Sequence, residues 1–109
     1  MRILIAFLVS MCCGVAAAQG VPDIDIGPSC RASAAGHAGL IQNEDLCRKS
    51  EEVARDLLLK EWSSFPEADR NSCYGLTTTG TPGTYTELLT CLEMRRDTRK
   101  IFNSGGLEK

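Results

Sequence analysis

The chain has 109 residues, of which 43% are hydrophobic and 24% charged, and its formal net charge is −2. This length predicts a single small domain. A mildly acidic chain gains nothing from counterion release on a phosphate backbone, so the composition excludes nucleic acid as an expected partner.

Residues 1–18 have the layout of a secretory signal peptide. Arg2 precedes an apolar run that extends from Ile3 to Ala18, and the alanines at its end provide a cleavage site before Gln19. The run is shorter than the roughly 20 apolar residues that cross a bilayer. We therefore predict export without stable membrane insertion after signal cleavage.

Two cysteines inside the signal, Cys12 and Cys13, raise lipid attachment as an alternative. Lipoprotein signals place a small residue before the modified cysteine, whereas Met11 and Cys12 occupy those positions here. We expect both cysteines to be removed with the signal. The mature chain, residues 19–109, is predicted to be periplasmic or secreted, with a net charge of −3 because Arg2 is lost.

The mature chain opens with residues 19–28, QGVPDIDIGP, whose prolines and glycines predict an extended, partly mobile segment. A cation site at Asp23 and Asp25 is the alternative. Calcium loops need further oxygen ligands at fixed spacing, and these are absent. We expect no metal or other cofactor.

Two helices are predicted next. Ser29 is the expected N-cap of a short helix that ends at Gly36. Asn43 is the expected N-cap of a long amphipathic helix over 44–62. Its apolar positions are Leu46, Cys47, Val53, Ala54, Leu57, Leu58 and Trp62. The charged face is predicted to carry two i, i+4 ion pairs, Glu51 with Arg55 and Asp56 with Lys60.

The following segment predicts a short helix over 65–74. Ser64 and Glu67 have the spacing of a capping box. The helix would direct Phe65 and Cys73 inward, and Gly75 would end it.

The last helix is predicted to begin at Thr84, which forms a second capping box with Glu87. Its buried stripe is expected to contain Tyr85, Leu88, Leu89, Cys91 and Leu92. Its C-terminal half is basic, and we expect a solvated helix end, with a basic patch for a partner as the alternative. These basic residues are Arg95, Arg96, Arg99 and Lys100.

The predicted fold class is all-α. We expect a small bundle of two long and one or two short helices over residues 29–103, followed by a flexible tail, 104–109. Four cysteines remain in the mature chain, and their wide spacing argues against a zinc site and for two disulfides. Three pairings are open. We favour Cys30–Cys47 with Cys73–Cys91, while Cys30–Cys73 with Cys47–Cys91 remains an alternative.

The sequence contains no convincing catalytic motif, and we predict that the protein is not an enzyme. Gly75 and Gly80 have P-loop spacing, but Thr81 and Pro82 follow where the phosphate-binding lysine and hydroxyl residue belong. His37 is the only histidine and has no local partner for nucleophilic catalysis.

Two further groups of residues have a structural interpretation and a functional alternative. The carboxylates Glu52, Asp56 and Glu61 offer pairs for glycoside chemistry, but we expect a solvated helix face. Trp62 and Tyr85 offer rings for ligand stacking, but we expect core residues.

Three stretches carry a family resemblance: DIGPSC at residues 25–30, CRKSEEVARD at 47–56 and YTELLTCLEMRRD at 85–97. The chain resembles a group of small exported four-cysteine proteins of Gram-negative bacteria whose function is uncharacterised. The resemblance implies export and paired cysteines, and no mechanism. A looser likeness is to helical periplasmic lysozyme-inhibitor domains, at the level of fold and compartment.

These observations predict a small non-catalytic exported protein that binds another envelope component, with an envelope protein as the expected partner. The alternative is an inhibitor of a cell-wall hydrolase that presents a loop such as 76–83 to an active site. Only the four cysteines Cys30, Cys47, Cys73 and Cys91 are predicted as special residues.

Overall fold

The computed structural model describes residues 20–36 and 43–105, and this part of the chain is helical without strands. The elements are α1 (Gly27–Gly36), α2 (Glu44–Glu61), the short 3-10 helix η1 (Trp62–Ser64), α3 (Glu67–Thr77) and α4 (Tyr85–Asn103). The predicted all-α class, with two long and two short helices, is confirmed. The predicted signal peptide (residues 1–18), His37 and residues 106–109 lie outside the described residues.

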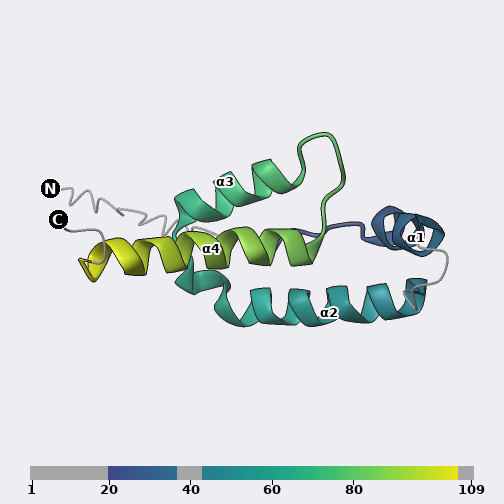
Figure 1. Ribbon diagram of the computed structural model, residues 1–109, viewed down its shortest axis with the longest axis horizontal. Helices are drawn as coiled ribbons and strands as arrows, with labels where there is room; N and C mark the ends of the chain where they lie inside the picture. The colour runs from purple at the N-terminus through teal and green to yellow at the C-terminus, as the bar shows by residue number, and fades with distance from the viewer. Residues whose placement is uncertain (1–19, 37–42, 106–109) are drawn as a thin grey trace, which may run out of the picture.

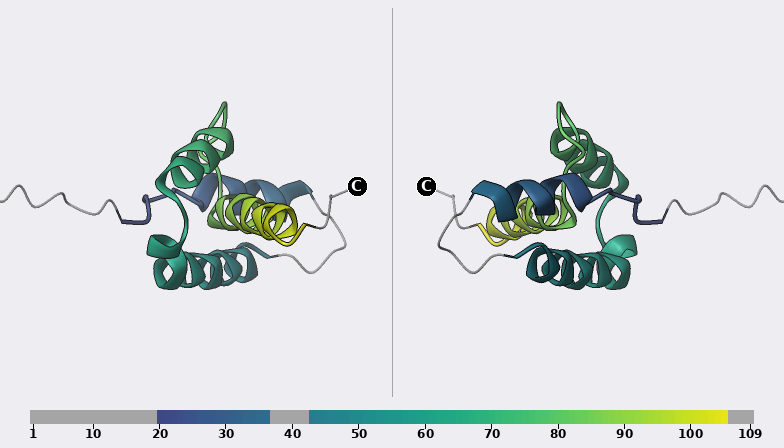
Figure 2. Two further views of the ribbon diagram at one scale, coloured as in Figure 1. Left: turned by 90° about the vertical axis from the view of Figure 1, so that its left-hand side faces the viewer. Right: turned by 90° about the vertical axis from the view of Figure 1, so that its right-hand side faces the viewer.

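Helix α4 lies at the centre of the molecule, with α2 along one side and α3 along the other (Figure 1). α2 and α4 run in the same direction, and α3 runs in the opposite one. α1 lies at one end, where it packs against α2. An end-on view shows that α4 separates α2 from α3 (Figure 2). One side of α4 has none of the other described helices against it.

Two disulfides fasten this arrangement. Cys30–Cys47 joins α1 to α2, and Cys73–Cys91 joins α3 to α4. The favoured pairing is confirmed and the interleaved alternative is wrong. Each bridge connects two helices that are neighbours both in space and along the chain, so each closes a short loop of the kind that restricts the unfolded chain.

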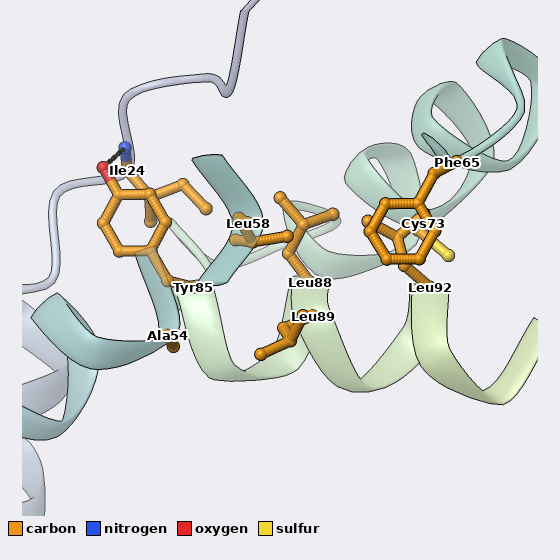
Figure 3. Close-up of a cluster of buried hydrophobic side chains, with 9 residues drawn as sticks. All are labelled: Ile24, Ala54, Leu58, Phe65, Cys73, Tyr85, Leu88, Leu89 and Leu92. Carbon is orange, nitrogen blue, oxygen red and sulfur yellow. Dashed lines mark hydrogen bonds between the residues drawn. The ribbon is translucent and has the colours of Figure 1, made fainter. Parts of the chain in front are cut away.

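The hydrophobic core lies where α2, α3 and α4 meet the N-terminal segment. Tyr85 packs beside Ile24 at one end of the cluster, and Phe65 packs beside Leu92 and Cys73 at the other (Figure 3). α4 contributes more residues to this core than any other element, and they lie on one face of the helix because they follow one another at helical spacing. The buried cluster consists of Ile24, Ala54, Leu58, Phe65, Cys73, Tyr85, Leu88, Leu89 and Leu92.

The core-facing side of α2 differs from the prediction. Ala54 and Leu58 are buried as expected, but Leu46, Val53 and Leu57 are exposed to solvent. The two sets lie on faces about 100° apart, because Val53 directly precedes Ala54 and Leu57 directly precedes Leu58.

The N-terminal segment is more ordered than its prolines and glycines predict. It is extended up to Ile26, but Ile24 is buried and its backbone N–H donates a hydrogen bond of 2.9 Å to the Tyr85 hydroxyl. Val21 and Ile26 pack against the core as well. The segment is therefore part of the folded body and closes one side of the core.

Local capping signals predicted the starts of the two long helices. The Asn43 side chain accepts a hydrogen bond from the N–H of Leu46 at 2.7 Å, and the Thr84 hydroxyl accepts one from the N–H of Glu87 at 3.0 Å. Both caps are confirmed, and they satisfy amide groups that have no partner within the helix.

The starts of the two short helices were predicted incorrectly. α1 begins at Gly27, so Ser29 lies inside it. α3 begins at Glu67 without a side-chain cap, because the Ser64 hydroxyl donates to the Glu61 carbonyl instead. Gly75 also lies inside α3 and does not end it.

None of the helices in the described part of the chain is long and apolar enough to span a membrane.

Candidate functional site

Glu51 shows how α2 is attached to the first turn of α4. The sequence places this residue on a charged, solvent-facing side of α2, but its exposed fraction is only 5%. Its carboxylate accepts hydrogen bonds from the N–H of Tyr85 at 2.7 Å, the N–H of Thr86 at 3.3 Å and the Thr86 hydroxyl. Helix N-termini favour negative charge. Glu51 therefore caps α4, and the predicted pair with Arg55 does not form.

A second buried carboxylate, Asp69, joins α3 to α4. One of its oxygens accepts a hydrogen bond of 3.2 Å from the Arg99 guanidinium, and the other lies 2.8 Å from a second nitrogen of the same group. A guanidinium nitrogen of Arg95 lies 3.8 Å away, and another donates to the Ser72 hydroxyl at 2.8 Å. Two arginines thus share one carboxylate, so this edge of α4 retains positive charge.

The third arginine of α4 faces the opposite neighbour. Arg96 pairs with Glu61 of α2 at 3.0 Å, and its guanidinium lies over the Phe65 ring, 4.9 Å from the ring centre. The prediction of a solvated basic helix end is incomplete for three arginines, whose side chains are 40%, 31% and 49% exposed but also hold α4 against both neighbouring helices. It is correct for Lys100, which is exposed.

The side chains considered for catalysis are not arranged for it. Glu52 and Asp56 are exposed, while Glu61 is occupied by Arg96. Tyr85 is buried in the core and Trp62 packs against it, as predicted. Within residues 20–36 and 43–105, no three histidine, cysteine or acidic residues are grouped so that they could hold a metal ion.

The acidic residues of the N-terminal segment have a local role. Asp25 accepts a hydrogen bond from the N–H of Gly27 at 3.0 Å, which supports the first turn of α1. Asp23 is exposed. The interpretation of this segment as structural therefore agrees with the side-chain geometry.

The threonine-rich loop between α3 and α4 projects from the body of the molecule (Figure 1). Gly80 and Gly83 adopt positive φ angles of 75° and 77° and turn the chain back. The hydroxyls of Thr78 and Thr79 donate to carbonyl groups at the end of α3. The loop is a connector whose hydroxyls complete the end of α3, and Cys73–Cys91 fastens its base.

An open groove of about 830 Å³ follows the outer side of α4. Met94 and Phe102 lie in it with exposed fractions of 64% and 60%. Arg95 and Arg99 line one edge, where they also contact Asp69. The described lining residues are Thr86, Glu87, Thr90, Cys91, Met94, Arg95, Thr98, Arg99 and Phe102.

Sequence reasoning missed this groove. It identified the buried stripe of α4, whereas the groove follows a second stripe with i, i+4 spacing through Thr86, Thr90, Met94, Thr98 and Phe102. Methionine and phenylalanine are only two of its five members, so the apolar signal is diluted. The structure brings these residues together on the side of α4 that no other described helix covers.

Comparison with known proteins does not extend these findings. No protein-family model, curated protein or solved structure matches the chain. The resemblance to small exported four-cysteine proteins therefore stays a prediction, and the geometry of the groove is the observation on which a function can be argued.

Proposed function

We propose that the protein is a non-catalytic exported module that binds another envelope protein in the groove along α4. The observation that carries this proposal is the groove itself, in which Met94 and Phe102 remain more than half exposed on the central helix of the fold. Exposed apolar side chains gathered in one groove of a small protein mark an interaction site more often than apolar residues scattered singly do.

The contacts that hold α4 in place make the groove a preformed binding surface. Cys91 lies in the groove and its disulfide fastens α4 to α3, while Glu51 and Glu61 hold the same helix against α2. A surface on a fixed helix loses little conformational entropy when a partner binds. The two disulfides also favour an oxidising compartment, and we extend this to the periplasm or the extracellular space.

The positive charge at the groove edge indicates which side chains the partner should carry. Arg95, Arg99 and Asp69 together carry one net positive charge at the edge, and Glu87 supplies a negative charge nearer the start of α4. The expected partner is an amphipathic helix that places apolar side chains on Met94 and Phe102 and acidic side chains beside the arginines.

Site-specific photo-crosslinking in cells tests this proposal. A photoreactive amino acid at Met94 should give a discrete adduct with an envelope protein, because Met94 lies in the groove. The matched control carries the same group at Leu59, which is 50% exposed on α2 and outside the groove. Equal adducts from both positions, or none from Met94, would contradict the proposal.

A purified system separates the two parts of the proposal. Two synthetic amphipathic helices are compared that share one apolar face and differ only in carrying glutamate or lysine beside it. The acidic peptide should bind the protein at least about tenfold more tightly than the basic one. Met94→Asp should weaken binding of the acidic peptide, and equal affinity for both peptides would disprove the assigned partner chemistry.

The projecting loop supports a second candidate function, inhibition of a cell-wall hydrolase. Thr79, Gly80 and Thr81 are exposed at its tip, and a disulfide closes its base between Cys73 and Cys91. A fixed, projecting loop is a shape that can enter an active-site cleft. Inhibition of lysozyme that a Thr79→Asp, Thr81→Asp variant loses would support this candidate, and no inhibition at high protein concentration would exclude lysozyme as its target.

A further inference from the structure

The outer side of α2 carries an apolar stripe that the core does not use. Leu46, Val53 and Leu57 are exposed by 45%, 60% and 40%. The inward side of the same helix contains Cys47, Glu51, Ala54 and Leu58, which contact α1 and α4. The stripe is therefore separate from both the core and the α4 groove.

The spacing of this stripe is that of a helix-pairing seam. With Ser50 included, its members follow one another after four, three and four residues: Leu46, Ser50, Val53 and Leu57. A 3.5-residue repeat keeps one seam against a partner helix along its length. An isolated amphipathic helix packed on a globular core needs no second seam of this kind.

We propose that α2 of two copies of this protein pair antiparallel about a two-fold axis through this seam. In the register that aligns the apolar positions, Leu46 lies against Leu57 of the second copy, and Ser50 lies against Val53 of the second copy. Symmetry repeats each contact. The small Ser50 side chain leaves space for the β-branched Val53 at the centre.

The flanking charges specify this register. Lys49 and Asp56 each precede a seam position by one residue, so they lie on the same edge of the helix. Antiparallel pairing puts Lys49 across from Asp56 of the second copy, twice per dimer. Both residues are exposed, and neither makes an ion pair within the part of the chain that the structure describes. The intrahelical pair predicted between Asp56 and Lys60 does not form.

The opposite orientation is disfavoured by the same charges. In a parallel pair, Asp56 would lie near Glu61 of the second copy, and no acidic residue would face Lys49. The two helix dipoles would also be aligned, which antiparallel packing avoids. Opposite charges therefore face each other across the seam in the antiparallel pair and not in the parallel one.

Charge exchange provides a sharp test by sedimentation equilibrium of the oxidised full-length mature protein. Lys49→Asp and Asp56→Lys should each weaken dimerisation at least about tenfold, because each places like charges across the seam. The double variant Lys49→Asp, Asp56→Lys should restore it. The two positions lie about 10 Å apart along one helix, so rescue must arise between copies.

The outcomes decide the proposal in either direction. Val53→Asp should abolish the dimer, whereas Met94→Asp in the α4 groove should leave it unchanged, which separates this inference from the proposed binding function. A dimer that survives both single charge reversals, or a wild-type protein that stays monomeric up to about 1 mM, where even a weak interface would associate, would overturn it. Circular dichroism melting confirms that each surface variant remains folded.

Discussion

The carboxylate of Glu51 and the backbone N–H of Tyr85 form a hydrogen bond of 2.7 Å between residues 34 positions apart in the chain. Tyr85 is the first residue of α4, so this bond fixes where the central helix begins relative to α2. Tyr85 also accepts the hydrogen bond from Ile24 through its hydroxyl. One turn of α4 thus organises three separate parts of the fold.

Replacing Glu51 should be the most damaging change to a charged residue. Glu51→Ala leaves two amide groups at the start of α4 without their acceptor and should lower the free energy of unfolding by about 2–3 kcal/mol. Urea unfolding measures the loss. Glu52→Ala, one residue along and exposed, is the control and should change stability by less than about 0.5 kcal/mol. Equal losses would show that the cap is unimportant.

Asp69 should be important because two arginines depend on it. Asp69→Asn removes the charge that holds Arg99 and attracts Arg95, and we expect a loss of about 1–2 kcal/mol, since both guanidinium groups are partly exposed and screened by water. The exposed Asp97 of α4 is the matched control. A salt titration provides a second measurement, because high salt should reduce the difference between wild type and Asp69→Asn.

Two glycines in the connector should respond differently to alanine. Both have positive φ angles, but a Cβ atom at Gly83 would lie 2.7 Å from a Thr77 methyl carbon and 2.9 Å from the Thr77 carbonyl oxygen, whereas Gly80 faces open space. Gly80→Ala should cost about 1 kcal/mol from backbone strain alone. Gly83→Ala should cost at least about 1 kcal/mol more. Thermal melts of the two variants test this order, and its reversal would contradict the loop geometry.

The two disulfides should stabilise different parts of the molecule. They close loops of nearly equal length, with separations of 17 and 18 residues, so the chain-entropy model assigns each about 3 kcal/mol. Cys73 belongs to the core cluster, whereas Cys30 fastens α1, which packs on α2. Cys30→Ala with Cys47→Ala should therefore release α1 locally, and Cys73→Ala with Cys91→Ala should weaken the core.

Hydrogen exchange distinguishes these two effects. Amides of α1 should lose protection in the first double variant while those of α4 keep theirs. In the second double variant, α3 and α4 should lose protection together. Uniform loss across all helices in both variants would show that the bridges stabilise one undivided cooperative unit.

The sequence predicts those features that depend on neighbouring residues. Asn43 and Thr84 cap the helices that follow them because their side chains reach amides three residues away. It does not predict features that depend on distant partners. Glu51 reads as a surface residue because nothing nearby shows that it meets Tyr85, and the positive charges of Arg96 and Arg99 read as solvated because Glu61 and Asp69 lie at least 30 residues away.

The orientation of α2 shows this limit most clearly. One face contains Leu46, Val53 and Leu57, and an adjacent face contains Ala54 and Leu58 together with Glu51. Periodicity alone does not choose between the two faces, since both have apolar residues at helical spacing. The folded chain buries the second, because Glu51 finds amide donors at the start of α4. The α4 groove was missed for a related reason, since its apolar members Met94 and Phe102 are separated by threonines.

Burial of Ile24 has a practical consequence for anyone who labels this protein. Val21 and Ile24 already pack against the core, so a tag joined directly before Gly20 would stand a single residue away from the packed interior. A bulky fusion there would compete with the packing of Val21 and Ile24 and would tend to displace the N-terminal segment from the body. Fluorophores and affinity handles belong after Lys109, beyond the end of α4.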